Sequence, residues 1–366
     1  MNKKQEALCW YWLYNIEGIG PKIRHKLLSI YETPFELFEH LKEQDLNCLS
    51  IPCKTIQNLI QSRNMERIQK SYDMLEKRGI RVVTLADEEY PKRLMQIYDV
   101  PGVLYVKGQL PDEDCPTIAI VGARECTNYG KEIATYFARH LSEAGVQIVS
   151  GLARGVDRYA HEGAVNNLGG TYAVLGCGID ICYPRENINL YMEIEKQGGI
   201  LSEYPPGYQP LQGNFPMRNR IISGLADGIL LVEARKKSGS LITMEYGLDQ
   251  GKNIYACPGR ITDSLSYGTN HIIQMGGKLV LEPSDILEDF GLDVIRLRQE
   301  KPDLSLLDSN EKSIYELLSL MPKHVEEILS ESHKKVDQVT QLLLQLQLKG
   351  LIKEIAGNYY SKTFPS

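Results

Sequence analysis

The stretch that decides the fold class is Thr117-Ile-Ala-Ile-Val-Gly-Ala-Arg124, in which an uncharged apolar run ends in a glycine turn followed by an arginine. Runs of this kind recur through residues 117–290 and alternate with segments of helical periodicity. Short continuous apolar strands that alternate with helices are typical of a parallel sheet covered on both faces. The sequence therefore predicts an α/β fold, with a Rossmann-like, doubly wound parallel sheet at residues 117–290.

The predicted strands cover residues 117–121, 146–150, 171–175, 199–202, 228–232, 253–256 and 278–281. The predicted helices cover residues 129–143, 157–167, 188–196, 219–225, 241–250 and 268–275. In such sheets ligands bind outside the carboxyl ends of the strands, so the residues that follow each strand are the candidates for a site.

Glycines, arginines and small hydroxyl residues gather at these strand ends. Glycine lets backbone amides approach an anion closely, and the planar fork of arginine matches phosphate. Ser238-Gly-Ser240 opens a helix, where free amides and the helix dipole favour an anion, and Arg235-Lys-Lys237 stands directly before it. Phe215, near Arg218 and Arg220, offers an aromatic face for a base, or is a core residue. These loops predict a phosphate-binding pocket.

The sequence lacks the familiar cofactor and catalytic motifs. The turn after the first strand reads Gly122-Ala-Arg-Glu-Cys-Thr127 instead of the G-x-G-x-x-G of a dinucleotide site. Gly130-Lys131 is followed by Glu132, where a P-loop has serine or threonine. Asp157 and His161 are four apart on a helix and within reach of each other, and such a pair is more often structural than catalytic. We predict a binding protein without cofactor, metal or catalytic residues.

Four further segments flank the predicted core. Residues 1–80 read as helical, and Asn15-Ile-Glu-Gly-Ile-Gly-Pro-Lys22 is either a helix-hairpin-helix turn of the DNA-binding type or a plain connection between packed helices. Residues 81–116 form a connector with two short strands, and residues 291–304 form a linker. Residues 305–366 predict three helices and a hairpin that turns at Gly357-Asn358, which together make a winged helix.

The charge balance limits the kind of nucleic-acid binding. The chain has 41 Lys and Arg against 47 Asp and Glu, a net charge of −6, and residues 117–290 carry 15 basic against 19 acidic residues. A protein that coats duplex DNA by bulk charge is therefore disfavoured, whereas a local cationic pocket is compatible with these numbers. Residues 305–366 hold 7 Lys, no Arg and 8 acidic residues, which favours a protein contact there over weak DNA binding.

Cysteine usage and apolar run lengths bear on the compartment. None of the 8 cysteines forms a CxxC pair, which predicts the reduced thiols of a cytoplasmic protein. No apolar run approaches the roughly 18 residues that would span a bilayer, and the N-terminal segment lacks the small-residue cleavage site of a signal peptide. We expect a cytoplasmic protein without membrane association.

Longer motifs resemble a known protein family. The stretch Phe215-Pro-Met-Arg-Asn-Arg-Ile-Ile-Ser-Gly-Leu225, followed by Val232-Glu-Ala234 and Ser238-Gly-Ser-Leu-Ile-Thr243, closely resembles the DNA-processing protein A (DprA/Smf) family. Three further sets of residues fit the family pattern in the same order. They are Ser150–Asp157 with Ala160-His161, Gly178-Ile-Asp180 with Tyr183-Pro184, and Pro258-Gly259. Ala123 stands where a serine is usual and Val156 where an isoleucine is usual, and neither departure removes a charge.

The resemblance implies a bacterial cytoplasmic protein that binds single-stranded DNA, protects incoming DNA during natural transformation and helps load the RecA recombinase. It also implies a sterile-alpha-motif-like N-terminal domain, no established catalytic activity, and a homodimer formed through the Rossmann-like domain. Carried over by motif, the DNA contacts fall on Arg124, Lys131, Arg154, Phe215, Arg218, Asn219, Arg220, Ser238, Gly239 and Ser240. Arg124 and the amides of Ser238–Ser240 would hold phosphates, Phe215 would stack or pack, and Asn219 would contact DNA or brace the loop.

Two other classes of function stay open from the residues. A Rossmann-like nucleotide hydrolase could take its acid from Glu203, Glu233 or Glu245. An adaptor could instead bind a small anion in the same pocket. Within the DNA-binding class, a genome-maintenance role would suit a host that is not naturally transformable.

The surface expected to form the homodimer is the segment Leu265–Lys278. It pairs the apolar Ile272, Ile273 and Met275 with few charges, although two of these three could be core residues. Such a contact would be isologous, with the same patch on both chains.

Overall fold

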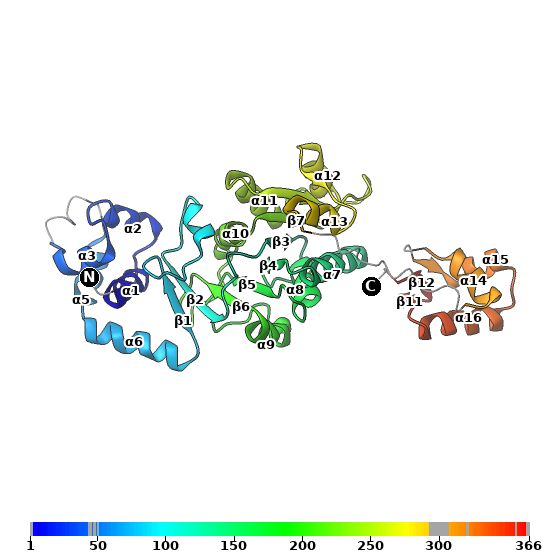
Figure 1. Ribbon diagram of the computed structural model, residues 1–366, viewed down its shortest axis with the longest axis horizontal. Coiled ribbons are helices and arrows are strands. Elements are labelled where there is room, and N and C mark those ends of the chain that lie inside the picture. Colours follow the sequence, from blue (N-terminus) through cyan, green and yellow to red (C-terminus); the bar gives the residue numbers. More distant parts are fainter. Residues whose placement is uncertain are drawn as a thin grey trace. The chain divides into compact units, whose positions relative to one another are not determined.

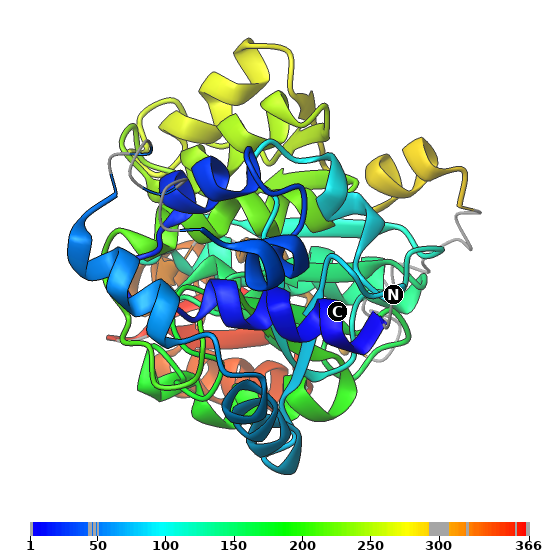
Figure 2. The same ribbon diagram turned by 90° about the vertical axis from the view of Figure 1, so that its left-hand side faces the viewer.

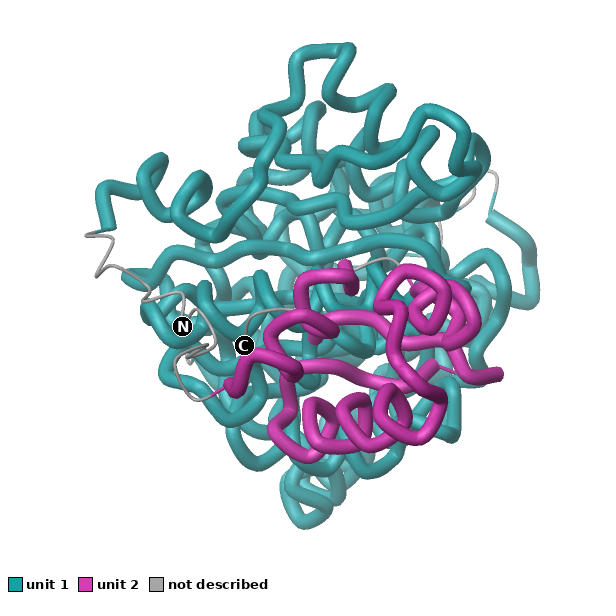
Figure 3. Tube along the Cα trace, turned by 90° about the vertical axis from the view of Figure 1, so that its right-hand side faces the viewer, with its two compact units in different colours: residues 1–293 teal, residues 294–366 magenta. Residues whose placement is uncertain are grey.

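The computed structural model describes residues 3–42, 46, 49, 51–292, 307–319, 322–355 and 357–363. The chain forms two compact units, residues 1–293 and 294–366, which are coloured separately in Figure 3. The linker predicted at 291–304 lies outside the described residues from position 293 onward.

The first unit is built on one sheet, in which the described residues form strands in the order β1-β2-β6-β5-β4-β3-β7-β8-β9 (Figure 1). The bounds are β1 Arg81–Thr84, β2 Val103–Gly108, β3 Thr117–Val121, β4 Gln147–Ser150, β5 Thr171–Leu175, β6 Gly199–Ser202, β7 Gly228–Leu231, β8 Asn253–Ala256 and β9 Lys278–Leu279. Strands β3 to β9 pair in parallel, whereas β1 pairs antiparallel with β2, and β2 with β6. The strand order reverses at β3, between β4 and β7, which is the switch point of a doubly wound sheet.

Helices cover both faces of this sheet. They are α7 Asn128–Glu143, α8 Val156–Ala164, α9 Ile188–Gln197, α10 Asn214–Leu225, α11 Gly239–Asp249, α12 Tyr267–Gln274 and α13 Ser284–Leu287. The neighbours Ile200 and Leu201 of β6 point to opposite faces, as side chains alternate along a strand. Ile200 joins the core cluster of Ile194 on α9, and Leu201 joins the cluster of Ile222 on α10. The predicted Rossmann-like α/β core is therefore confirmed.

The N-terminal helices pack against the antiparallel edge of the sheet (Figure 2). They are α1 Lys3–Tyr14, α2 Pro21–Leu28, α3 Pro34–His40, α5 Cys53–Gln61 and α6 Met65–Lys77. Tyr105 of β2 donates its hydroxyl hydrogen to Asn15 Oδ1 at 2.9 Å, and the amide of Gly102 donates to Tyr14 Oη at 3.0 Å. These contacts join the helical region to the sheet in one packed body, while the predicted boundaries at 80 and 116 stay predictions.

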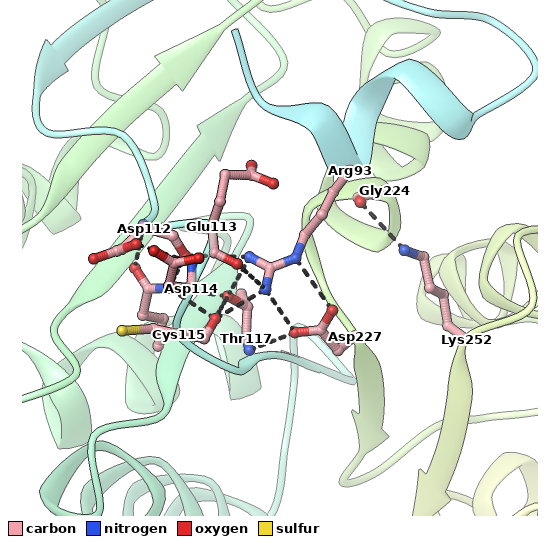
Figure 4. A network of polar contacts seen from close by, with 10 residues as sticks. Arg93, Asp112, Glu113, Asp114, Cys115, Thr117, Gly224, Asp227 and Lys252 are labelled. Atoms are coloured by element: carbon pink, nitrogen blue, oxygen red, sulfur yellow. Dashed lines mark hydrogen bonds and ion pairs between the residues drawn. The ribbon is translucent and has the colours of Figure 1, made fainter. Parts of the chain in front are cut away.

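A polar network closes the amino ends of the central strands (Figure 4). Arg93, in the short helix η1 (Lys92–Gln96), pairs with Asp227 just before β7, with 3.1 Å between Nη2 and Oδ2. The same guanidinium donates to the Thr117 hydroxyl and to the backbone oxygens of Asp112, Glu113 and Cys115. Because each nitrogen of Arg93 has a partner, the segment before β3 is fixed to the sheet.

The second unit is a winged helix, as predicted. Its helices are α14 Ser309–Leu317, α15 Val325–Ser332 and α16 Val336–Leu348, and its strands β10 Lys323–His324, β11 Ile352–Ile355 and β12 Tyr359–Lys362 form a sheet in the order β10-β12-β11. Gly357 and Asn358 make the turn of the wing with φ of 80° and 62°. Asp308 caps α14 and forms a capping box with Glu311. Across the part of the chain that the structure describes, helices fall short of the length and apolarity that a bilayer crossing demands.

Candidate nucleic-acid interface

A cleft of about 780 Å³ opens at the carboxyl ends of β3, β4 and β7, beside the switch point. Seven of the ten predicted site residues line it: Arg124, Phe215, Arg218, Asn219, Ser238, Gly239 and Ser240. Arg154 lines a smaller adjoining pocket that shares Arg124, Phe215 and Arg218 with the cleft. Lys131 and Arg220 line neither pocket.

Helix α10 brings the aromatic and basic residues of the site together. It begins at Asn214, five residues before the predicted start, because Pro216 lies in the first turn, where a helix needs no amide hydrogen. Residues two apart on a helix point about 200° apart. Arg218 and Arg220 therefore face opposite sides of α10 and have different surroundings.

Arg218 forms part of the floor of the cleft and is 4% exposed. Its Nη1 donates to the Gly151 carbonyl at 2.8 Å and to the Val174 carbonyl. A Cβ on Gly151 would lie 2.5 Å from Arg218 Nη2 and 2.7 Å from Asp157 Oδ2, so only glycine leaves room for this pair. Burial lowers the pKa of Arg218, and the nearby Asp157 carboxylate opposes that shift. The floor thus holds a cation whose position is set by backbone oxygens.

Arg220 points away from the cleft and has its own acidic partners. Its Nη2 donates to Glu203 Oε2 at 2.6 Å, and its Nε lies 3.1 Å from Asp99 Oδ2. Burial disfavours the charge on Arg220, but Glu203 and Asp99 together hold its pKa above the ordinary value. This arrangement braces α10 against the sheet, and DNA contact by Arg220 stays a prediction.

Two exposed cations of the cleft lack an acidic partner among the described residues, namely Arg124 after β3 and Lys237 before α11. The Arg124 guanidinium carbon lies 5.3 Å from the ring centroid of Phe215, within the range of a cation–π contact. The Phe215 ring lies 5.5 Å from the Tyr183 ring at an interplanar angle of 33°. The cleft therefore offers free positive charge beside an aromatic pair.

The N-terminus of α11 forms another wall of the cleft. Ser238 precedes its first residue, Gly239, and the Ser238 side chain does not cap the helix, because the hydroxyls of Ser238 and Ser240 bond each other at 2.8 Å. Asn219 donates to the Gly239 carbonyl at 3.3 Å and accepts from Arg218 Nε at 3.3 Å. These bonds let Asn219 brace the loop, and its contact with DNA stays a prediction. Uncapped amides and the helix dipole make this end suitable for an anion.

The three acids considered for nucleotide hydrolysis stand elsewhere. Glu233 is 4% exposed and accepts from the amide of Thr127 at 2.9 Å and from its hydroxyl at 2.6 Å, which fixes the start of α7. Glu203 pairs with Arg220, and Glu245 is exposed on α11. None of them is among the residues that line the cleft. Among the described residues, no group of three or more His, Cys, Asp or Glu could hold a metal ion.

Below the floor of the cleft lies His161, which is fully buried. Its Nδ1 lies 2.7 Å from the Thr171 hydroxyl, which donates to the Ile148 carbonyl, so Nδ1–H is the donor to Thr171. Burial, reinforced by the charge of Arg218, lowers the pKa of His161 to about 3. His161 is therefore a neutral structural residue that bonds Thr171 instead of Asp157.

Sequence reasoning missed two residues of the cleft. Tyr183 follows a strand end, and an aromatic residue at such a position is a signal for stacking. Lys237 belongs to the basic run Arg235–Lys237 and lines the cleft, so its charge was the available signal. Lys131 is placed away from it, with its Nζ 5.7 Å from the Tyr159 ring.

Comparison with known proteins bears directly on this arrangement. The family described as DNA recombination-mediator protein A matches residues 81–291, which include the whole cleft. The chain belongs to the DprA family. Residues 298–358 match the DprA winged helix domain, in agreement with the fold of the second unit.

Other members of the DprA family share much of the chain. DNA processing protein DprA of Streptococcus pneumoniae is 44% identical over 207 residues, 57% of this chain and 73% of that protein. Protein Smf of Escherichia coli is 37% identical over 302 residues, 80% of each chain.

Solved DprA structures resemble this chain in fold. The X-ray structure of DprA from Streptococcus pneumoniae has a TM-score of 0.66 and 35% identity and covers 76% of this chain and 96% of that one. The DprA of Helicobacter pylori, whose structure is described as giving insight into a single-stranded DNA binding mode, has a TM-score of 0.52 and 33% identity. It covers 57% of this chain and 95% of that one.

Proposed function

We propose that this protein binds single-stranded DNA in the cleft at the carboxyl ends of β3, β4 and β7. The observation that carries the proposal is a pair of exposed cations, Arg124 and Lys237, beside the Tyr183–Phe215 aromatic pair. Within the described part of the chain neither cation has an acidic partner. The uncapped start of α11 adds backbone amides for a further phosphate. The description of the Helicobacter pylori DprA as a single-stranded DNA binder supports the same reading.

The aromatic pair favours a single strand over a duplex. A base must leave its own stack to lie against Tyr183 or Phe215, and unpaired bases do so at much lower cost than paired ones. Since every base has a π face, and phosphates carry no sequence information, binding should depend little on sequence.

The test is binding of fluorescent oligonucleotides, with single strands and duplexes of equal length, across a series of salt concentrations. Each phosphate held by the cleft adds about 0.7 to the slope of log affinity against log salt for a single strand. We expect tighter binding of the single strand and a steep slope. Equal affinity at low and moderate salt, or preference for the duplex, would remove the proposal.

In the cell, we propose that the protein protects incoming single strands in the cytoplasm during natural transformation and helps to load RecA on them. Family membership supports this role, and a genome-maintenance role would use the same binding. The check is the rate at which purified RecA assembles on a single strand in the presence and absence of this protein. An unchanged rate, together with normal DNA binding, would separate RecA loading from the DNA-binding proposal.

We also propose a homodimer formed through the region around α12. Ile272 packs in the core, but Ile261, Tyr267, Met275 and Leu281 are exposed by 48% to 96% and form a set of apolar side chains in this region. Light scattering across a concentration series should give twice the mass of one chain, and Met275→Asp should reduce it. Leu168→Asp, at an exposed apolar residue outside this region, is the matched control. A strict monomer at tens of micromolar would contradict the dimer.

No observation favours a nucleotide hydrolase that takes its acid from Glu203, Glu233 or Glu245, because none of these three lines the cleft. Glu233 accepts from Thr127, and Glu203 pairs with Arg220. Incubation of the purified protein with nucleotides would reveal turnover if this assignment were mistaken.

A further inference from the structure

Arg154 differs from the free cations of the cleft because its guanidinium already pairs with a carboxylate, that of Glu186. Its Nε lies 3.0 Å from Glu186 Oε1 and its Nη2 lies 3.1 Å from Glu186 Oε2. This two-point fork is the geometry in which arginine also holds a phosphate. Arg154 lines the small pocket together with Arg124 and Arg218, so its occupied fork stands next to the proposed path of the strand.

The pair is held by the structure on both sides. Glu186 lies in the short helix η2 (Arg185–Asn187), and Asn187 is only 2% exposed. Asn187 Nδ2 donates to the Leu152 carbonyl at 3.0 Å and to the Ala153 carbonyl at 3.4 Å. A buried amide thereby fixes η2 against the loop that carries Arg154, and the Glu186 carboxylate is kept opposite the guanidinium.

The other arginines of the cleft show that this arrangement is specific. The contact of Arg235 with Glu125 joins one nitrogen, Nη1, to one carboxylate oxygen at 3.4 Å, and both side chains are largely exposed. Arg124 has no acidic partner among the described residues. The side chains of Arg154 and Glu186 are 62% and 47% exposed, so both remain accessible to a ligand from solvent.

We propose that Glu186 competes with a strand phosphate for Arg154 and thereby speeds release of single-stranded DNA from the cleft. The inference rests on the proposed function. Exposed ion pairs are weak, so a phosphate can displace the carboxylate. Once displaced, the Glu186 carboxylate lies close to the strand and repels it. The cleft therefore holds DNA less tightly than its arginines alone would allow, which suits a protein that must pass a strand on.

The experiment compares Glu186→Gln with Glu162→Gln in the full-length protein, using a fluorescent single-stranded 20-mer. Glu162 is the matched control, because it pairs with Arg158 at 2.7 Å on α8 and lines neither pocket, and its substitution changes the net charge equally. We expect Glu186→Gln to tighten binding about two- to five-fold more than the control, mainly through slower dissociation. The salt slope should rise by at most about 0.7, the value for one full phosphate contact, because Glu186 already yields Arg154 to a phosphate for part of the time.

Arg154→Ala supplies the second arm. In that background Glu186→Gln should behave like Glu162→Gln, because the arginine for which the carboxylate competes is gone. Weaker binding by Glu186→Gln would overturn the proposal and make Glu186 a residue that positions Arg154 for the strand. Equal effects of the two glutamine substitutions would also overturn it. If the unaltered protein fails to bind the 20-mer at all, the proposed function itself fails.

Discussion

The cationic side chains at the two ends of the parallel sheet differ in how many partners the protein gives them. At the amino end, Arg93 gives hydrogen bonds to five residues and has no donor atom to spare (Figure 4). At the carboxyl end, Arg124 and Lys237 lie exposed without an acidic partner among the described residues. The comparison teaches that the role of a cationic side chain depends on whether the protein already supplies its hydrogen-bond and ion-pair partners. A cation that the protein satisfies stabilises the fold, and a cation left open faces a ligand.

The same contrast exists within one helix. Arg218 and Arg220 are two positions apart on α10 and equally buried, at 4% exposure. Arg218 bonds backbone oxygens and lines the cleft, whereas Arg220 bonds Glu203 and Asp99 on the other side. Substitutions at satisfied and open cations should therefore separate stability from DNA binding.

The largest effect on stability is expected for Arg220→Ala. Removal of one member of a buried ion pair leaves the carboxylate of Glu203 without its partner, which costs about 3 kcal/mol in the free energy of unfolding. Chemical denaturation measures this loss. Arg78→Ala is the control, because Arg78 pairs with Asp180 at an exposed site and should cost less than about 1 kcal/mol. If Arg220→Ala is as stable as that control, the brace is absent in solution.

Arg93→Ala should cause the next largest loss of stability, about 2 to 3 kcal/mol in the free energy of unfolding. The cost is smaller than for Arg220 because the Arg93 side chain is 15% exposed and Asp227 still accepts from the Thr117 amide. Single-strand affinity, measured where the variant is fully folded, should stay unchanged. A loss of DNA binding with normal stability would break the comparison between the two ends of the sheet.

A pH dependence tests the buried layer beneath the cleft. His161 has a pKa of about 3 in the folded chain, against about 6.5 when exposed, so the unfolded chain binds more protons between these values. The free energy of unfolding contributed by His161 is complete above pH 6.5 and is lost as the pH falls through this window. Between pH 7 and pH 5 the loss is about 2 kcal/mol.

The measurement is urea denaturation of the unaltered protein and of His161→Asn at both pH values. Burial raises the pKa of Asp157, which acts in the opposite direction but equally in both proteins. The unaltered protein should lose about 2 kcal/mol more than the variant. Equal losses would mean that His161 is not kept neutral.

The smallest effect is expected for removal of residues 301–366. The cleft lies wholly within the first compact unit, so the shortened chain should fold and bind a single strand with affinity within about two-fold of the full chain. Size-exclusion chromatography and oligonucleotide binding measure this. An insoluble or non-binding product would assign part of the site to the winged helix.

The sequence was most informative about the strands of the core. The runs Thr117–Val121, Thr171–Leu175 and Gly199–Ser202 have the predicted bounds, because buried parallel strands are continuous apolar segments that end at glycine or polar residues. The sequence did not indicate that β1 and β2 join this sheet, since pairing between distant segments leaves no local signal in the sequence. Helix α10 begins five residues before the predicted start, and Pro216 lies in its first turn, where proline is tolerated.

The location of the site could be predicted from the sequence, but the partners and burial of each side chain could not. Glycines and arginines at the strand ends indicated the cleft, since the switch point gathers them. Nothing local distinguishes Arg218 from Arg220, because their partners come from Gly151, Val174 and Glu203, which are distant in sequence. The two-residue spacing on a helix would have separated them had the start of α10 been placed correctly.

The central claim is that the exposed cations of the cleft, and not the arginines whose partners are fixed in the fold, such as Arg93 and Arg220, bind a single strand. The most direct test is the affinity of Arg124→Ala/Lys237→Ala for a single-stranded 20-mer, measured together with its stability and with Arg93→Ala as the opposite case. Each charge-assisted phosphate contact is worth about 1.5 to 3 kcal/mol, so affinity should fall at least a hundred-fold. The salt slope should fall by about 1.4, with the free energy of unfolding unchanged. Affinity equal to that of the unaltered protein, or a loss that merely follows a loss of stability, would contradict the account.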